Sequence, residues 1–225
     1  MSKILKPYPR HRTLMALTIS LLPSNGLRVL LYRLLMGYRI GPGSRIGVMT
    51  VIACESFHAG RGVSIGRSNR FIGPVRVELG DKVIIGRFNQ VICGASAADP
   101  AKAAMNYARR FVLGDKVLVN DSHYFDAYGL IEIGAGSWVA GTASQFWTHG
   151  ASVMERDIVV GAGCYLGSAV RFAPGSGLGD GCVLGLGSVV VSKIDDRNAV
   201  IAGFPAKKIR EISVEDDRQF VFQAN

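Results

Sequence analysis

Residues 160–190 read VGAGCY, LGSAVR, FAPGSG, LGDGCV, LGLGSV and V, a repeat of six residues. Each repeat begins with a large apolar side chain, and the series is Val160, Leu166, Phe172, Leu178, Leu184 and Val190. Glycine directly follows four of these residues, at positions 161, 167, 179 and 185. A small or β-branched residue comes four positions after successive members, and these are Cys164, Val170, Ser176, Cys182 and Ser188.

The same repeat occupies earlier parts of the chain, with breaks between the runs. The large apolar residues of these runs are Ile40, Ile46, Ile52, Ile65, Phe71, Leu79, Ile85, Val91, Leu113, Val119, Phe125, Ile133 and Val139. Glycine again follows many of them, as in Ile40-Gly41 and Leu79-Gly80. The breaks predict loop insertions near 94–110 and 146–157.

A period of six fits neither an α-helix, which repeats near 3.6 residues, nor a simple amphipathic strand, which repeats near two. Six residues suffice for one short strand and a corner, and three such units close a triangular coil. Successive coils pair at about 4.8 Å, so equivalent positions stack in columns. The large residue then points inward, the small residue fits the corner, and glycine relieves crowding of the backbone at the turn.

This repeat resembles that of the hexapeptide-repeat acyltransferases over roughly residues 40–210, and Ala202-Gly203-Phe204-Pro205-Ala206-Lys207 closely resembles the family's closing segment. The resemblance implies an all-β fold, a left-handed parallel β-helix, although most parallel crossovers are right-handed. We expect a basic, leucine-rich helical segment over 1–39, the β-helix over 40–198, and a closing segment and tail over 199–225.

The composition favours a folded chain with one basic end. Of the 225 residues, 48% are hydrophobic and 19% charged, which excludes a disordered chain. The net charge is +9, yet residues 1–45 carry eight basic side chains and no acidic one, so the remainder is close to neutral. Such a segment could contact an anionic membrane, bind nucleic acid, or be solvated. No nucleic-acid motif is present, and nucleic-acid binding is not expected.

The N-terminal leucines predict a helix that begins at Ser24 or Asn25 and stops at Gly37. We expect this helix to cover the open first coil, with peripheral membrane contact as the alternative. Residues 14–22 resemble a short secretion signal, but no small-residue cleavage site follows and nine residues are too few to span a bilayer. A cytoplasmic location, at most peripheral to the inner membrane face, is therefore expected.

The four cysteines, Cys54, Cys93, Cys164 and Cys182, show no C-x-x-C spacing. They indicate buried thiols in a reducing compartment and neither a disulfide framework nor a zinc site.

Acyl transfer from a thioester to a hydroxyl requires a general base, and histidine suits this role because its ordinary pKa is near 6.5. The chain has four histidines: His11, His58, His123 and His149. His11 lies in the basic segment, and His58 on an early repeat is most simply structural. Because His149 lies in a loop just before the regular run, where related acetyltransferases carry the catalytic histidine, the resemblance implies that it is the base.

Acceptor-binding residues also follow from the resemblance. In the maltose and galactoside acetyltransferases an asparagine that contacts the acceptor occupies the place of Asn120, and an acidic residue lies near the place of Asp126. His123 occupies a small-residue position, so it either lines the acceptor site or packs in the corner. Trp147, beside His149 in the second insertion, is a further candidate for acceptor contact.

The co-substrate implied by the family is acetyl-CoA, and no metal is expected. Matching the family segment by segment assigns Ser168, Leu186, Ser192 and Lys193 to the pantetheine groove, with Lys207 and Arg210 toward the phosphates, where cations are apt. Leu186 departs from the small residue usual there, and the register near Ser192 differs from the family by one residue. The resemblance further implies a homotrimer with active sites between subunits.

Together these features predict an acetyl-CoA-dependent O-acetyltransferase that acts on a sugar or polysaccharide-precursor hydroxyl. Several alternatives stay open: an N-acetyltransferase of an amino sugar, a xenobiotic acetyltransferase, or a non-catalytic β-helix scaffold. A zinc site of the β-helix carbonic anhydrase kind would require His58, His123 and His149 to converge.

Overall fold

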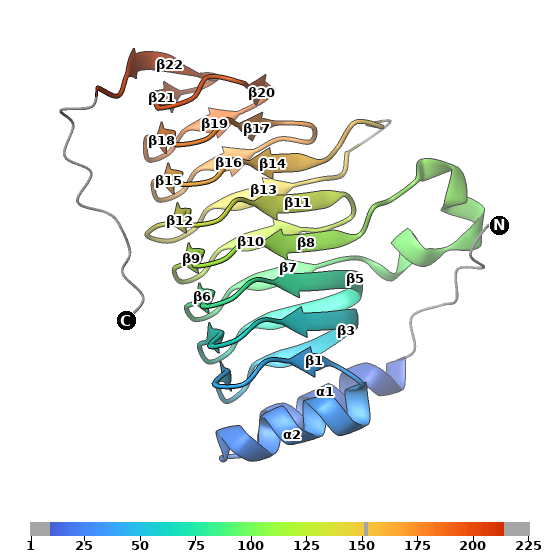
Figure 1. The fold of residues 1–225 in the computed structure, drawn as a ribbon. Coiled ribbons are helices and arrows are strands. Elements are labelled where there is room, and N and C mark those ends of the chain that lie inside the picture. Colours follow the sequence, from blue (N-terminus) through green and yellow to red (C-terminus); the bar gives the residue numbers. More distant parts are fainter. Residues whose placement is uncertain (1–9, 151–152, 214–225) are drawn as a thin grey trace.

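The computed structural model describes residues 10–150 and 153–213, which form a three-sided prism of short parallel strands with two helices at its base (Figure 1). The fold is a left-handed parallel β-helix, as the repeat and the family resemblance predict. Each turn of the chain contributes one strand to each of three faces, and neighbouring turns pair in parallel.

The first face is a single sheet with strands in chain order. Its members are β2 (Arg45–Ile46), β4 (Ser64–Ile65), β6 (Ile84–Ile85), β9 (Leu118–Val119), β12 (Trp138–Val139), β15 (Tyr165–Leu166), β18 (Val183–Leu184), β21 (Ala199–Gly203) and β22 (Ala206–Glu211).

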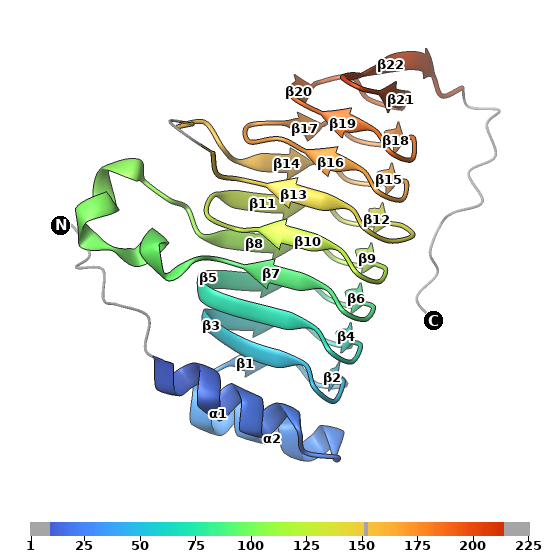
Figure 2. The ribbon, with the colours of Figure 1, turned by 180° about the vertical axis from the view of Figure 1, so that it is seen from behind.

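The second and third faces belong to one continuous sheet, because β3 (Val51–Ala59) and β5 (Arg70–Leu79) run across both. The second face continues with β7 (Gln90–Ile92), β10 (Tyr124–Asp126), β13 (Gln145–Trp147), β16 (Arg171–Phe172) and β19 (Val189–Val190), as Figure 2 shows. The third face holds β1 (Arg39–Ile40), β8 (Arg110–Leu113), β11 (Leu130–Ile133), β14 (Ile158–Val160), β17 (Gly177–Leu178) and β20 (Lys193–Ile194).

The repeat residues fill the prism in columns. Every large apolar residue of the 160–190 run is buried. Behind the second face, Phe125, Phe146 and Phe172 stack with ring centroids 4.8 and 4.7 Å apart, so the ring separation matches the rung spacing. A Cβ on Gly47 would lie 2.4 Å from the backbone carbon of Gly66 on the next rung, and one on Gly161 would lie 2.6 Å from the amide nitrogen of Asp180. The glycines of the repeat therefore allow adjacent turns to approach.

Two helices, α1 (Arg10–Ser20) and α2 (Asn25–Met36), cover the base of the prism. Ser24 caps α2 by accepting a hydrogen bond from the Leu27 amide, and Gly37 ends the helix in the left-handed conformation. Among the described residues, no helix has the length and apolar character needed to span a bilayer.

Side chains of the two helices satisfy the backbone groups that the first coil leaves open. Arg28 donates from Nε and Nη2 to the Ile46 carbonyl, at 2.9 and 2.8 Å, and the Asn25 side chain accepts from the Ile46 amide at 2.8 Å. The Tyr32 hydroxyl donates to the Thr50 carbonyl at 2.8 Å and accepts from the Ile52 amide at 3.2 Å. The helices thus complete the hydrogen bonding that a preceding rung would supply.

Strand pairing sets the boundaries of the coil and of its insertions. β21 pairs in parallel with β18 through Ile201, and β22 then reverses direction against β21. The first insertion contains two 3-10 helices, Ala95–Ala98 and Pro100–Met105, and ends where β8 begins at Arg110. The second begins only after Trp147, because β13 keeps its pairing through that residue.

Replacing Tyr32 with phenylalanine should lower the free energy of unfolding by roughly 1–3 kcal/mol, because the buried Thr50 carbonyl and Ile52 amide lose their hydroxyl partner. Urea unfolding monitored by circular dichroism measures this loss. Leu34→Ala on the exposed side of the same helix is the control and should change stability by much less. Equal stability of Tyr32→Phe and the parent protein would contradict this account of the cap.

Candidate active site

The prism has two corners that carry the candidate site residues. The first corner joins the first face to the second, and its turns follow β9, β15 and β18. The second corner joins the second face to the third, and both insertions, 94–109 and 148–157, leave the coil there. In Figure 1 the turns of the first corner lie toward the left edge, and the insertions project at the right.

His149 and Asp126 form a close pair at the second corner. Asp126 is the last residue of β10, and it pairs in register with Trp147 on the next rung. The chain turns directly after Trp147, so His149 reaches back over Asp126, with 2.6 Å between its Nδ1 and Oδ2 of the carboxylate. The Asp126 side chain is 3% exposed, whereas that of His149 is 44% exposed. One end of the imidazole is therefore held from inside the protein while the other faces solvent.

The local backbone holds Asp126 in place. Its Oδ2 also accepts from the amides of Thr148 and His149, each at 3.2 Å. The Thr148 hydroxyl donates to the Asp126 carbonyl and accepts from the Gly129 amide. A buried carboxylate beside Nδ1 favours the tautomer with the proton on that nitrogen, which leaves the Nε2 lone pair free to accept one. Asp126 thus orients His149, a role that the sequence did not assign.

Aromatic residues support the histidine ring, and these were not predicted. Tyr128 stacks on His149 with a centroid separation of 4.3 Å and an interplanar angle of 29°. Tyr107 of the first insertion meets Tyr128 edge to face, and the Arg156 guanidinium lies 4.6 Å from the Tyr107 ring centre. Both insertions therefore contribute to the wall around His149. The one signal for this wall in the sequence is that Tyr128 lies at a break in the repeat.

Trp147 lies on the outer surface of the second face, beside the pair. Its side chain is 37% exposed, and its ring lies 5.0 Å from that of Tyr124 on the preceding rung. The two rings form an aromatic surface next to Asp126 and His149.

His123 lies inside the first corner, where the structure supports the packing alternative. It is 1% exposed, its amide donates to the Asn89 side chain, and its Nδ1 accepts from the Ser144 amide at 3.1 Å. It belongs to a column of inward polar residues that bridge successive rungs: Thr50, Asn69, Asn89, His123 and Ser144. Burial lowers the pKa of His123 to about 4, so the ring is neutral near pH 7. Its side chain has no exposed surface with which to line an acceptor pocket.

Asn120, Ser168 and Leu186 all lie at the first corner, in the turns after β9, β15 and β18. The Asn120 side chain accepts from Trp138 Nε1 at 3.0 Å, and Leu186 is 81% exposed. The second face separates these residues from His149 at the second corner within one chain. The structure therefore does not bring Asn120 and His149 together in a single subunit.

Ser192, Lys193 and Lys207 line one groove of about 730 Å³ near the C-terminal end of the prism. β19, which ends two residues before Ser192, lies two rungs beyond β13, so the groove begins roughly 10 Å along the prism from the rung that carries His149. The neighbouring Lys208 is paired with Asp196 and Glu211, which raises its pKa, whereas Lys207 is exposed in the same groove. Arg210 lies on the same strand, β22, outside the lining of this groove.

The cysteines are all buried, and burial raises the pKa of Cys54, Cys93 and Cys164 to about 12. These three thiols are thus poor nucleophiles near neutral pH. Within residues 10–150 and 153–213, no three histidine, cysteine, aspartate or glutamate side chains gather as a metal-ligand set. His58 is exposed on β3, away from the buried His123 and from His149.

Comparison with known proteins finds acetyltransferases among the similar sequences and solved structures. No protein-family model matches the chain. Over 117 residues it is 35% identical to WcaF of Escherichia coli (strain K12), provisionally named a colanic acid biosynthesis acetyltransferase; the alignment covers 48% of this chain and 62% of WcaF. Over 66 residues it is 39% identical to the galactoside O-acetyltransferase of the same organism, covering 29% and 32% of the two chains. The alignments thus span less than two thirds of either relative.

Among solved structures, a hexapeptide-repeat acetyltransferase of Vibrio cholerae O1 biovar eltor, complexed with acetyl-CoA, superposes with a TM-score of 0.53 at 17% identity, covering 91% of this chain and 87% of that one. This likeness shows the fold. The class defined by fold and repeat is thus the hexapeptide-repeat β-helix. Within that class, parts of the sequence are similar to WcaF and to a galactoside O-acetyltransferase.

The buried, neutral His123 should make stability depend on pH. Its pKa is about 4 in the folded protein and near 6.5 in the unfolded chain, so the unfolded state binds more protons between these values. The free energy of unfolding should therefore fall as pH drops from 6.5 toward 4, by up to about 3 kcal/mol from this residue.

His123→Asn keeps a polar side chain like those of Asn69 and Asn89 and should lose this part of the pH dependence. Chemical unfolding at pH 7 and pH 4.5 measures the difference, with the exposed His58→Asn as control. The same acid sensitivity in parent and His123→Asn would contradict the buried, neutral state.

Proposed function

We propose that the protein is an acetyl-CoA-dependent O-acetyltransferase of a sugar or polysaccharide-precursor hydroxyl, with His149 as the general base. The observation that carries the proposal is the 2.6 Å contact between His149 Nδ1 and the buried Asp126 carboxylate. It leaves the other imidazole nitrogen free to accept a proton, which is what removal of a hydroxyl proton requires. The resemblance to acetyltransferases of sugars and polysaccharides supports this acceptor class.

His149 then moves a proton in both halves of the reaction. Its Nε2 takes the proton of the acceptor hydroxyl as the oxygen attacks the acyl carbonyl, and Asp126 stabilises the imidazolium that forms. The same nitrogen returns the proton to the departing thiolate, so His149 ends the cycle neutral. Acetyl-CoA, when bound, supplies the acetyl group as an activated thioester. Tyr128 and the Thr148 turn keep the ring in one orientation throughout.

Direct transfer fits the side chains better than an acyl-enzyme. A covalent route needs a nucleophile activated by a neighbouring base. Burial raises the pKa of Cys54, Cys93 and Cys164, and the close partner of His149 is a carboxylate. The acceptor hydroxyl is therefore the proposed nucleophile.

The proposed binding site for acetyl-CoA is the groove that contains Ser192, Lys193 and Lys207. The lysines offer cations for its phosphates, and the groove lies along the prism from His149 on the C-terminal side. Asn120, Ser168 and Leu186 lie at the other corner of the same chain. In a homotrimer, as the resemblance implies, the first corner of one subunit would face the second corner of the next, and each active site would combine both sets.

Replacing His149 with alanine should lower the turnover number by roughly 10²–10⁴-fold, because the general base is lost, with coenzyme A affinity retained. Asp126→Asn should lower it by roughly 10²-fold or more, because an amide stabilises neither the tautomer nor the imidazolium.

Thiol release from acetyl-CoA with sugar acceptors gives the rate, and calorimetry gives the affinity. Glu155→Gln is the control for Asp126→Asn, because Glu155 is an exposed acidic residue of the insertion that carries His149. Full activity of His149→Ala would remove it from the proposed role, and absence of acetyl-CoA binding by the parent protein would favour the scaffold alternative.

The double variant Lys207→Ala with Arg210→Ala should weaken coenzyme A binding by roughly tenfold or more, because cations at the phosphate end are lost. Titration calorimetry measures the change. Lys82→Ala, an exposed lysine at a distant corner turn, should leave the affinity unchanged. Unaltered affinity in the double variant would contradict the assignment of the phosphate end.

A further inference from the structure

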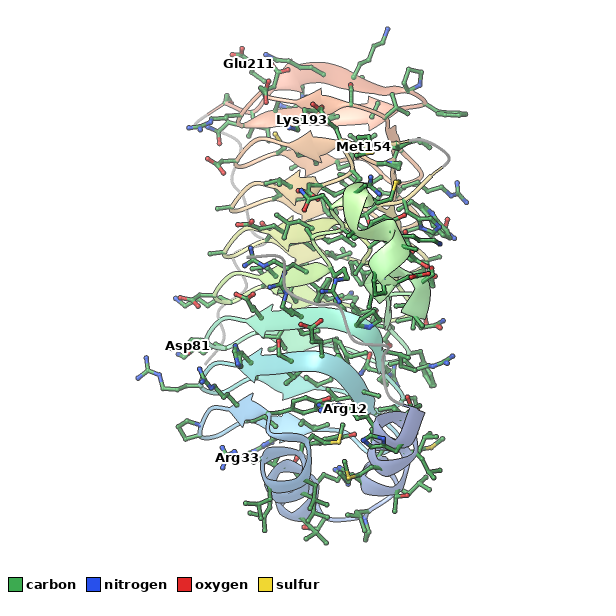
Figure 3. All side chains as sticks on the ribbon, turned by 90° about the vertical axis from the view of Figure 1, so that its right-hand side faces the viewer. Arg12, Arg33, Asp81, Met154, Lys193 and Glu211 are labelled. Atoms are coloured by element: carbon green, nitrogen blue, oxygen red, sulfur yellow. The ribbon has the colours of Figure 1, made fainter. Side chains whose placement is uncertain are left out.

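The helices at the base of the prism have a second, outward surface that the cap does not use. α1 and α2 direct Ala16, Ile19, Val29, Tyr32 and Met36 into the protein. Their opposite sides carry large apolar residues that are 41–69% exposed: Leu14, Leu17, Leu21, Leu27, Leu30, Leu34 and Leu35. Figure 3 shows both helices side by side beneath the coils, with side chains directed away from the prism.

The spacing of these leucines places them along one side of each helix segment. Leu14, Leu17 and Leu21 follow one another at intervals of three and four residues, and Leu27, Leu30 and Leu34 repeat this spacing on α2. Residues at these intervals lie on one side of a helix. We call the seven exposed leucines the leucine face. Large exposed apolar patches are rare on monomeric soluble proteins and mark interaction sites.

Basic side chains lie at the same end of the prism as the leucine face. The first acidic residue of the chain is Glu55, so the helices and the first turn of the coil carry cations alone. Arg12 and Arg28 are used in hydrogen bonds to backbone carbonyls of the cap and the first coil. Arg33, Arg39 and Arg45 are exposed near the same end of the prism. An apolar surface with a positive rim complements an anionic lipid bilayer, in which acyl chains lie beneath negative headgroups.

A groove extends the leucine face up the side of the prism. It has a volume of about 370 Å³ and is lined mainly by apolar side chains, among them Leu17, Leu21, Met49 and Ile72. Arg70 is its charged member, and the groove lies between α1 and the start of the second face. An acyl chain with an anionic headgroup matches this combination. At 11 and 12 residues the helices are too short to span a bilayer, so they would lie in its surface.

We propose that the leucine face docks onto an anionic membrane surface, with Arg39 and Arg45 contacting the headgroups. The inference is independent of the proposed acetyl transfer. In this orientation the rung of β13, from which His149 follows, stands four rungs beyond the start of β3, roughly 20 Å from the capped base. The site would then face acceptors held near the membrane surface.

Flotation of the 225-residue chain with vesicles tests the proposal. The protein should float with vesicles of phosphatidylcholine and phosphatidylglycerol and much less with phosphatidylcholine alone.

The double variant Leu30→Ser with Leu34→Ser should weaken partitioning into the vesicles by at least roughly tenfold. Arg39→Gln with Arg45→Gln should weaken it roughly thirtyfold on anionic vesicles at low salt, and little on neutral ones. Val159→Ser, on the third face, is the matched control for an exposed apolar residue. Parent protein that does not float with anionic vesicles would overturn the proposal.

A fluorescent label gives a second test that tolerates poor folding of the serine variants. The four native cysteines are buried, so Leu34→Cys can be labelled selectively with nitrobenzoxadiazole. Its emission should shift to the blue on addition of anionic vesicles, and that of labelled Val159→Cys should not. Emission already shifted without vesicles, or a lower oligomeric mass for Leu30→Ser with Leu34→Ser in light scattering, would show that protein covers the face and would contradict membrane docking.

Discussion

The close stacking of successive coils is the constraint on which the rest of this structure depends. At about 4.8 Å per rung, each position of the repeat lies directly against its equivalent on the next rung. A Cβ on Gly47 or Gly161 would collide with the neighbouring backbone, and the phenylalanine rings of the core stack at the same interval. The stacking also brings Asp126 and His149 together, because the two residues come from adjacent rungs and meet at the corner where β10 and β13 end. At the base no further rung is available, and Arg28, Tyr32 and Asn25 supply its hydrogen bonds instead.

The fold was predictable from the sequence because a six-residue period is a local property, visible without knowledge of distant contacts. His149 could be singled out for a related reason: the family resemblance marks the position just before the regular run. The role of Asp126 could not be predicted from the sequence, because it arises where the register of β10 and β13 places residues 23 positions apart side by side.

His123 illustrates the opposite case. Its position in the repeat allowed either packing or acceptor contact, and only the column from Thr50 to Ser144 shows that the ring bridges rungs inside the corner. Tyr128 and Tyr107 escaped notice because insertions follow no period.

The division of candidate residues between two corners connects the fold to the proposed function. His149, Asp126, Trp147, Ser192 and Lys193 lie on or beside the second corner, and Asn120, Ser168 and Leu186 occupy the first. Flat faces suit side-by-side packing of identical prisms, which would place unlike corners together. The two ends of the prism also carry different candidate surfaces. The base carries the leucine face, and the groove near β22 carries the cations suited to phosphates.

A crystal structure of the protein with coenzyme A would test the central claim most directly. The account predicts the thiol sulfur within hydrogen-bonding distance of His149 Nε2, Nδ1 still bonded to Asp126, and the phosphates directed toward Lys207. Coenzyme A bound with its thiol remote from His149, or a His149 ring turned away from Asp126 in the complex, would contradict the assignment of this pair as the catalytic base.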